Sequence, residues 1–457
     1  MLKIYNTLTR QVEEFKPRSK KEVGFYACGP TVYHYAHIGN LRAYVAQDVL
    51  RRTLKYNHYK VRHIMNITDV GHLTDDADAG EDKMEAGARR EGKNAWEIAR
   101  YYTEAFKQNL QDLNVLTPTI WCAATDHIQE QINQVQELID GGFTYETADG
   151  IYFDTTRVAD YGKLARLSKQ SLQAGKRVSL GEKKNPPDFA LWKWSRGDRQ
   201  MEWAAFGKMG FPGWHIECSA MSMKYLGDQF DLHAGGVDHI PVHHTNEIAQ
   251  AESITGLKPW VKYWFHNEFL LIKKDLSAPA GKMSKAKENF ITLSTLTDKG
   301  FSPLAFRYLL LQTHYRKQLT FSWEALAAAQ TGLNHLREQI KRISPNAPTD
   351  PIWEEKFLDL INADLNTPEA LALVWEALSA KQISEAAIIQ FDKILGLNLH
   401  NIKKKLAAPK AIQALLLDRA AAREQKDWTK SDQLRKKIEK FGYQLEDGPD
   451  GQKIHKK

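Results

Sequence analysis

The stretch of sequence that decides the fold is Val23-Gly24-Phe25-Tyr26-Ala27-Cys28-Gly29-Pro30-Thr31-Val32-Tyr33-His34-Tyr35-Ala36-His37-Ile38-Gly39-Asn40. Its first five residues are a short apolar run, and beyond Asn40 apolar residues recur at helical spacing. This pattern predicts a strand, a loop and a helix. In a parallel α/β sheet such a junction lies at the carboxyl end of a strand, where the helix directs unpaired N–H groups and its positive end at an anion. We therefore expect a nucleotide phosphate to bind here.

Four residues of this stretch are candidates for chemistry. Gly39 allows close approach of the backbone, and His37 and Asn40 can donate hydrogen bonds to phosphate oxygens. Cys28, at the tip of the predicted strand, brings a thiol to the same edge. Each also has an ordinary explanation, because His-x-Gly-Asn occurs by chance and a cysteine at a strand end is often a small buried apolar residue. Motifs elsewhere in the chain have to decide between the functional and the ordinary explanation of these residues.

The composition is that of an ordinary globular protein. The 457 residues suffice for about three domains, and 42% hydrophobic with 26% charged residues is typical of soluble chains. No apolar run approaches the length of a membrane span, and residues 1–5 resemble a strand rather than a signal peptide. We therefore expect a cytoplasmic protein without a membrane partner. Three cysteines, at 28, 122 and 218, are too few for a disulfide framework and favour a metal site or core burial.

The net charge of +7 is confined to the end of the chain. Residues 401–457 hold 15 Lys or Arg against 8 Asp or Glu, whereas the preceding 400 residues are balanced. One predicted helical stretch carries six of these cations, with Trp428 and Tyr443 available for stacking: Arg419, Arg423, Lys426, Lys430, Arg435 and Lys437. This pattern predicts a module that binds a nucleic-acid backbone. The alternative is a solvated surface.

The segments that follow the first helix predict a further strand of the same sheet and more helices. After them the composition of the chain changes. Residues 61–69 are typical of a second buried strand, which would bring Thr68 and Asp69 beside Cys28. Residues 75–90 predict a surface loop or a short helix, and helical patterns follow at 95–113 and 128–139. Beyond Gly141-Gly142 the chain is rich in Gly, Pro and basic residues, which favours an irregular insertion over further βα units.

A second dense group of reactive side chains lies between residues 210 and 252. His243 and Glu247 are four apart in a helical pattern, so both side chains fall on one face. With the two thiols they offer zinc a tetrahedral set: Cys28, Cys218, His243 and Glu247. The spacing differs from that of a compact zinc finger. Three other histidines are rival ligands, and hydrogen-bonded core histidines are the ordinary alternative: His233, His239 and His244.

A polar loop carries two lysines three residues apart, in Gly281-Lys282-Met283-Ser284-Lys285. Lys282 and Lys285 would reach phosphates held at residues 37–40 and stabilise charge that develops at the α-phosphate. The alternative is an exposed loop with no role.

Together these motifs resemble those of the class I cysteinyl-tRNA synthetases, and the likeness extends from residue 1 to about residue 457. The matching motifs are Cys-Gly-Pro-Thr-Val-Tyr at 28–33 with His-Ile-Gly-Asn at 37–40, Phe-Pro-Gly-Trp-His-Ile-Glu-Cys-Ser-Ala-Met at 211–221, and Lys-Met-Ser-Lys at 282–285. Residues 366–371 resemble the helical domain of that family, and residues 426–435 resemble its tail.

The resemblance implies roles for individual residues. A zinc ion, one per chain, would be held by Cys28, Cys218, His243 and Glu247 and would bind the thiolate of substrate cysteine. The cysteine pocket would contain Gly29, Thr68, Trp214, His233 and Asp238. ATP would be bound by His37, Gly39, Asn40 and Lys285, with His37, Asn40, Lys282 and Lys285 serving catalysis. The family usually has a second His where Asn40 stands, and Lys-Ser-Leu-Gly-Asn where residues 285–289 read Lys-Ala-Lys-Glu-Asn.

The expected fold is α/β: a Rossmann-type parallel-sheet catalytic domain with an inserted connective domain, a helical bundle and a small C-terminal module. The expected ranges are 1–120 and 210–270 for the catalytic domain, 121–209 for the insertion, 271–320 for a connecting domain, 321–400 for the bundle and 401–457 for a basic anticodon-binding module.

The expected reaction is ATP-dependent ligation of cysteine to tRNA(Cys) through a cysteinyl adenylate, with Mg²⁺ on the ATP and the protein acting as a monomer. Three alternatives remain from the sequence. They are a cysteine ligase that acts on a small amine, like the enzyme of mycothiol synthesis; a cytidylyltransferase-like nucleotidyl transferase; and a non-catalytic RNA-binding relative.

Overall fold

The computed structural model describes residues 1–71, 82–167, 183–197, 199–272, 281–282, 290–344, 347–401, 410–425, 427–448 and 451–456. The chain divides into two compact units, Met1–Leu399 and His400–Lys457, which are described separately. None of the helices in these ranges combines the length and apolar character of a membrane span.

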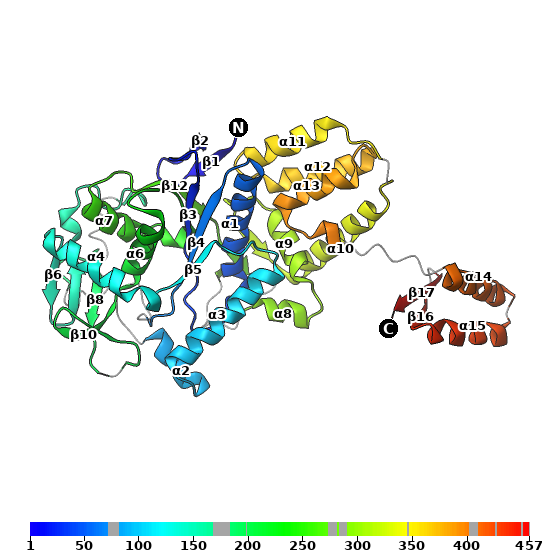
Figure 1. Cartoon of the computed structure of the whole chain (residues 1–457), viewed down its shortest axis with the longest axis horizontal. Coiled ribbons are helices and arrows are strands. Elements are labelled where there is room, and N and C mark those ends of the chain that lie inside the picture. The colour runs from blue at the N-terminus through cyan, green and yellow to red at the C-terminus, as the bar shows by residue number, and fades with distance from the viewer. Residues whose placement is uncertain are drawn as a thin grey trace. The chain divides into compact units, whose positions relative to one another are not determined.

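The centre of the first unit is a parallel sheet in the order β12-β11-β3-β4-β5 (Figure 1). Its strands are β3 (Val23–Ala27), β4 (Val61–Ile67), β5 (Ile120–Ala123), β11 (Phe230–Gly236) and β12 (Val261–Asn267). The chain runs outward from β3 through β4 to β5 and later returns to the other side of β3 with β11 and β12. This order makes the sheet Rossmann-type, with its topological switch point between β3 and β11, where such sheets bind ligands.

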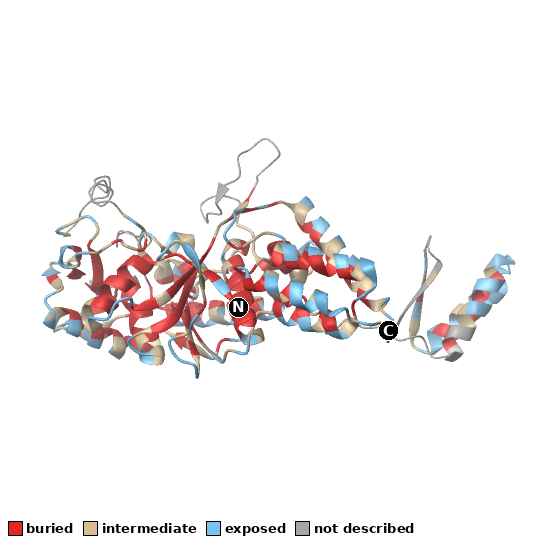
Figure 2. Cartoon of the chain, turned by 90° about the horizontal axis from the view of Figure 1, so that it is seen from above, coloured by how far each residue is buried: buried red, intermediate tan, exposed pale blue. Residues whose placement is uncertain are grey.

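Helices cover both faces of this sheet. Figure 1 shows α1 (Ile38–Tyr56) and α3 (Ala95–Asp112) on one side, and α4 (Ile128–Asp140), α6 (Trp214–Leu226) and α7 (His243–Thr255) on the other. Burial is continuous through the sheet and the inner helix faces (Figure 2). The predicted strand, loop and helix at residues 23–56 are confirmed, as are the second strand and the two helical patterns. A short helix, α2 (Lys83–Glu91), occupies part of 75–90, and residues 72–81 lie outside the described ranges.

The insertion contains regular structure that the sequence did not predict. Five antiparallel strands pair in the order β6-β7-β8-β10-β9. They are β6 (Thr144–Thr147), β7 (Gly150–Phe153), β8 (Phe189–Trp194), β9 (Trp203–Ala205) and β10 (Lys208–Pro212). Each strand has six residues or fewer, and β7 pairs with a strand more than 30 residues away, so local patterns gave no sign of the sheet. Residues 121–123 belong to β5 of the parallel sheet, although they were assigned to the insertion from the sequence.

The remainder of the first unit is mainly helical. A small sheet combines β13 (Leu270–Ile272), β14 (Gly281–Lys282) and β15 (Leu319–Phe321) and is accompanied by α8 (Leu293–Asp298) and α9 (Pro303–Leu311). Four longer helices follow: α10 (Trp323–Lys341), α11 (Pro351–Asn362), α12 (Thr367–Ala380) and α13 (Glu385–Leu395). The N-terminal hairpin consists of β1 (Lys3–Asn6) and β2 (Gln11–Glu14).

The second unit packs two helices on a hairpin, formed by α14 (Lys410–Glu424), α15 (Trp428–Lys440), β16 (Tyr443–Gly448) and β17 (Gly451–Lys456). The single helical stretch predicted for its cations is therefore two helices, because Asp427 caps α15 by accepting from the backbone N–H of Lys430 at 2.9 Å. Arg419 is only 1% exposed and pairs with Asp447 at 2.8 Å. Arg423 and Arg435 approach the same carboxylate at 3.1 and 3.5 Å. Three of the predicted nucleic-acid contacts thus share a counterion within the unit.

A buried carboxylate on α1 joins the sheet layer to the helices that follow it. Asp48 accepts hydrogen bonds from the side chains of Arg52 at 2.7 Å and Arg307 at 2.6 Å, and from the backbone N–H of Leu116 at 2.9 Å. Arg307, on α9, also donates to the carbonyl of Leu395 on α13 at 2.7 Å. Burial opposes ionisation of Asp48, but the two guanidinium groups outweigh it and hold its pKa below the ordinary value. The network fixes α1 against α9 and α13.

We expect Asp48→Asn to lower the free energy of unfolding by about 3–5 kcal/mol, because it removes the carboxylate that pairs directly with the buried Arg307. Urea titration of the intact protein measures this. Since folding lowers the pKa of Asp48, its stabilisation is present above the ordinary Asp pKa of about 4 and is lost as the pH falls.

The matched control is Asp160→Asn, which removes a half-exposed carboxylate paired with Lys258 at 2.8 Å. Its effect should stay within about 1 kcal/mol. Equal losses in the two variants would contradict the assigned importance of the Asp48 network.

Candidate active site

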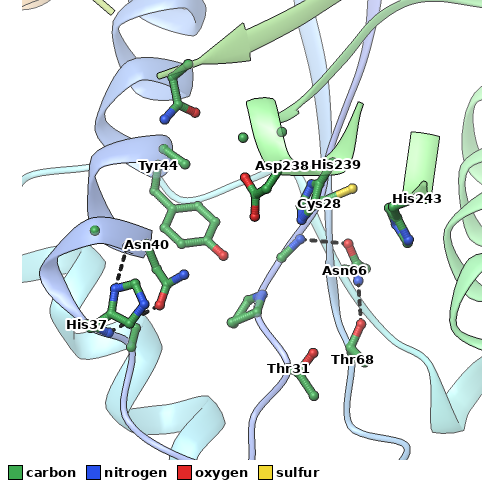
Figure 3. A pocket seen from close by; sticks show the side chains of 18 of the residues that line it. Cys28, Thr31, His37, Asn40, Tyr44, Asn66, Thr68, Asp238, His239 and His243 are labelled. Carbon is green, nitrogen blue, oxygen red and sulfur yellow. Dashed lines mark hydrogen bonds between the residues drawn. The ribbon is translucent and has the colours of Figure 1, made fainter. Parts of the chain in front are cut away.

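A pocket of about 400 Å³ opens at the carboxyl ends of β3 and β11, at the switch point of the sheet. Its lining includes ten of the predicted site residues: Cys28, Gly29, His37, Gly39, Asn40, Thr68, Trp214, Cys218, Asp238 and His243. Figure 3 shows His37 and Asn40 on one side of the pocket, and Cys28 and His243 toward the other. His233 and Glu247 do not line it. The side chain of Lys282 and all of Lys285 lie outside the described residues.

The wall formed by α1 presents hydrogen-bond donors. His37 caps the helix by accepting from the backbone N–H of Asn40 at Nδ1, at 3.0 Å, and the Asn40 side-chain oxygen accepts from the backbone N–H of His37 at 3.3 Å. The Asn40 amide therefore has its NH₂ group available to donate to a ligand. The first turn contains no acidic residue that would oppose an anion. A helix beginning of this kind suits a phosphate.

The floor of the pocket is held by a chain of buried hydrogen bonds. The backbone N–H of Gly29 donates to Asn66 at 2.8 Å, Asn66 donates to Thr68 at 3.0 Å, and Thr68 donates to Glu217 at 3.1 Å. Any side chain at Gly29 would collide with the Asn66 carbonyl, since a Cβ there would lie 1.6 Å from its oxygen. Burial raises the pKa of Glu217 well above its ordinary value. Asn66 and Glu217 were not predicted from the sequence. The feature that could have indicated them is that each is a polar residue within an otherwise buried element.

Trp214 and Lys83 complete the wall near α6. The Trp214 ring lies 4.4 Å from that of His243, between centroids, and the Lys83 ammonium lies 6.0 Å from the Trp214 ring. Lys83, at the start of α2, was not predicted. Asp238 follows β11 directly and lines the same pocket with a carboxylate.

The predicted metal ligands come together from three elements. Cys28 follows β3, Cys218 lies within α6, and His243 and Glu247 lie one turn apart at the start of α7. All four are buried, and one ligand atom of each lies within 4.8 Å of the others. His243 Nε2 is 2.6 Å from Glu247 Oε1. Two thiols, an imidazole and a carboxylate are donors that zinc takes, so the residues fit this ion.

The ionisation of the cluster favours a cation. Burial opposes ionisation of Cys218, but its hydrogen bond with Cys28 and the nearby His243 lower its pKa to about 7. Burial and the contact with Cys218 raise the pKa of Cys28, so one thiol of the pair ionises first. Burial likewise opposes ionisation of Glu247, but His233 and His243 hold its pKa below the ordinary range. A thiolate and a carboxylate in a buried space attract a metal ion.

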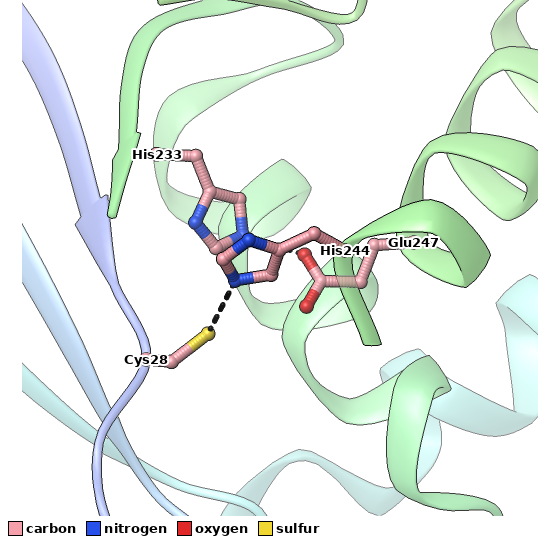
Figure 4. A group of neighbouring side chains, drawn as sticks. All are labelled: Cys28, His233, His244 and Glu247. Atoms are coloured by element: carbon pink, nitrogen blue, oxygen red, sulfur yellow. Dashed lines mark hydrogen bonds and ion pairs between the residues drawn. The ribbon is translucent and has the colours of Figure 1, made fainter. Parts of the chain in front are cut away.

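A second grouping shares Cys28 and Glu247 but uses His233 and His244 (Figure 4). His244 Nε2 lies 3.3 Å from the Cys28 sulfur, and His233 Nε2 lies 2.5 Å from Glu247 Oε2. His244 continues to His266 at 2.7 Å. Neither His233 nor His244 lines the pocket, whereas Cys218 and His243 do. We therefore assign His233 and His244 to the layer that orients Cys28 and Glu247 from behind. His233, expected around the cysteine pocket, contacts Glu247 instead.

Comparisons with known proteins agree with this geometry. Residues 14–331 match the family described as "tRNA synthetases class I (C) catalytic domain", and residues 407–454 match the "Cysteinyl-tRNA ligase anticodon binding domain". Cysteine–tRNA ligase 1 of Burkholderia lata is 51% identical over 99% of this chain and 96% of its own length. Cysteine–tRNA ligase of Treponema denticola is 43% identical over 98% of each chain.

A solved structure shows the same fold at low sequence identity. Methionyl-tRNA synthetase of Mycobacterium tuberculosis, in complex with methionyl-adenylate, aligns with a TM-score of 0.58 and 15% identity, covering 87% of this chain and 94% of that one. The predicted α/β fold is confirmed. The similarity of the whole chain to these ligases, together with the two matching domains, shows that it belongs to the class I aminoacyl-tRNA synthetases, in the cysteine–tRNA ligase family.

Proposed function

We propose that this cysteine–tRNA ligase forms a cysteinyl adenylate before it charges tRNA(Cys), and that a zinc ion held by Cys28, Cys218, His243 and Glu247 recognises the substrate thiolate. The observation that carries the proposal is the position of this donor set, because Cys28, Cys218 and His243 line the same pocket as the N-terminus of α1. The amino acid and the α-phosphate of ATP would therefore meet between the two walls. ATP would bring Mg²⁺.

The reaction needs positioning and charge stabilisation rather than a covalent nucleophile on the protein. A carboxylate oxygen of cysteine attacks the α-phosphorus, and pyrophosphate leaves. A terminal ribose hydroxyl of the tRNA then attacks the cysteinyl carbonyl, and AMP leaves. His37, Asn40 and the backbone around Gly39 would donate to phosphate oxygens. From the family resemblance, Lys282 and Lys285 would stabilise the charge that develops on the phosphates.

Selectivity for cysteine over serine requires more than pocket shape, because the two side chains differ only by sulfur in place of oxygen and a pocket separates such near-isosteres poorly. Zinc bound here would prefer a soft, readily ionised thiolate to an alcohol. Thr68 and Asp238 would offer oxygens to the substrate ammonium, and Gly29 lines the same pocket. Trp214 closes the space beside His243. His233 would act on this pocket through Glu247.

The alternatives have less support. A ligase that acts on a small amine has no need of residues 407–454, which match an anticodon-binding domain. A nucleotidyl transferase has no need of the buried thiol pair. A non-catalytic RNA-binding relative has no need of donors aimed at a phosphate. Cysteine-dependent ATP–pyrophosphate exchange followed by tRNA charging separates all four.

Cobalt substitution tests whether the metal contacts substrate. In the Co²⁺ protein, adding cysteine should intensify the sulfur-to-metal charge-transfer band, and adding serine should leave it unchanged, because only a thiolate adds a sulfur donor. Cys218→Ser should lose bound metal and cysteine activation together. The control is Cys122→Ser. Cys122 is buried but belongs to neither group of possible metal ligands, so this variant should keep its bound metal. A spectrum indifferent to cysteine in an active enzyme would give the metal a structural role.

Asn40 should act through its NH₂ group. Asn40→Asp keeps the oxygen that caps α1 but replaces the donor with a negative charge, so the rate of pyrophosphate exchange should fall by at least 10²-fold, as for loss of an electrostatic donor. Asn40→His restores the residue usual in the family and should keep activity. Thermal unfolding of both variants shows whether the substitutions destabilise the protein by disturbing the N-terminal cap of α1. Similar rates in Asn40→Asp and the unchanged enzyme would exclude this role.

Ending the chain after Ala408 should separate activation from tRNA binding. All the described residues that line the pocket precede residue 271, and Lys282 and Lys285 also precede the cut, so cysteine activation should be nearly unchanged. Affinity for tRNA should fall and become less dependent on salt, because the excess of cations is removed. As a point variant, Lys430→Ala should reduce the salt dependence, whereas Arg419→Met should destabilise the unit because Arg419 pairs internally with Asp447. An unchanged affinity and salt slope in the truncated protein would refute the role of the tail.

A further inference from the structure

An aromatic surface adjoins the pocket where Tyr35 lines it. Of the large hydrophobic side chains that are exposed in the described part of the chain, Tyr35 is the one that also lines the pocket. It is 37% exposed, and Tyr101, on α3, is 45% exposed. Their hydroxyl groups are hydrogen-bonded at 2.6 Å. The two side chains therefore extend the pocket wall onto the surface.

The packing beneath fixes both rings. The buried ring of Tyr102 meets Tyr35 edge-on with centroids 5.0 Å apart, and meets Tyr101 at 5.1 Å. Tyr102 also stacks on His34, a further pocket residue, at 5.8 Å. The hydrogen bond with Tyr101 raises the pKa of Tyr35 to about 12, so its ring is uncharged near neutral pH. Rigid, neutral rings of this kind bind flat ligands with little loss of conformational entropy.

Cations accompany the rings. The ammonium of Lys93 lies 4.6 Å from the centre of the Tyr101 ring. Arg90 donates to the carbonyl of Tyr33 at 3.1 Å, beside the pocket. Glu91 is the carboxylate nearby, 2.9 Å from Arg90 and 3.7 Å from Lys93. Proteins bind single-stranded nucleic acids through alternating aromatic and basic side chains, which stack on bases and contact phosphates.

We propose that Tyr35 and Tyr101 form a stacking surface for the unpaired nucleotides at the 3′ end of the tRNA. The inference rests on the charging reaction proposed above. The ribose that accepts cysteine must enter the pocket, so the unpaired nucleotides that precede it must cross the pocket rim. A stacking surface at the rim, with Lys93 for a phosphate, guides this strand without reading its sequence.

The test compares intact tRNA(Cys) with the same tRNA lacking its unpaired 3′ nucleotides. Tyr101→Ala should weaken binding of the intact tRNA by roughly 5- to 100-fold, the range for loss of one base–aromatic stack, and leave binding of the shortened tRNA unchanged. Tyr101→Phe keeps the ring and should bind both as the unchanged protein does. The matched control is Trp96→Ala, because Trp96 is also exposed on α3 but contacts Trp203 and does not line the pocket.

Pyrophosphate exchange separates this inference from the proposed function. Exchange should be unchanged in Tyr101→Ala, and a raised KM for ATP there would overturn the proposal by assigning the rings to the ATP site. Equal losses for both tRNAs would overturn it by placing the contact on the paired stem. Absence of charging by the unchanged protein would instead refute the proposed function.

A second readout does not depend on turnover. With 2-aminopurine in place of the base of the unpaired nucleotide that precedes the terminal one, stacking should quench its fluorescence on the unchanged protein, and Tyr101→Leu, which keeps an apolar side chain, should relieve most of that quenching. Equal quenching by both proteins would overturn the proposal.

Discussion

The parallel pairing of β3 with both β4 and β11 is the constraint on which the site depends. It places the carboxyl ends of three strands at one edge, so Cys28, Thr68 and Asp238 meet although they are far apart in the sequence. The backbone N–H of Cys28 donates to the Ala234 carbonyl at 3.1 Å, which extends the β3–β11 ladder to the first of the proposed metal ligands. A one-residue slip of β3 would move this thiol away from α6 and α7.

The sequence predicted the elements around the pocket because their signals are local. The apolar run 23–27 and the helical spacing after Asn40 have no competing interpretation, and the four-residue spacing of His243 and Glu247 holds on any helix. The insertion was not predicted as a sheet, since its strands are short and their partners are distant. Asn66 and Glu217 were missed because a polar residue in a buried element gains a function only through neighbours in space. The tail is a similar case, since counting charges in the sequence does not reveal that Arg419 forms an ion pair with Asp447.

Two sets of possible metal ligands share two members, and sequence alone leaves them equivalent. The structure distinguishes them by access, since Cys218 and His243 reach the pocket and His233 and His244 lie behind it. The rear histidines still matter, because His244 contacts Cys28 and His233 contacts Glu247. Hydrogen-bonded neighbours of this kind fix the direction and basicity of the ligands they touch. Cysteine recognition would thus depend on six side chains rather than four.

The ion pairs of Asp48 have a consequence for how the enzyme accommodates its ligands. Asp48 lies on the helix whose first turn carries His37 and Asn40, and it is fixed to α9 by Arg307. Sliding α1 along its axis or rotating it would separate buried charges, which is among the most costly rearrangements a protein interior can make. The pocket wall formed by α1 is therefore held firmly against α9, and we expect any adjustment of the pocket to its ligands to come from the elements on its other side.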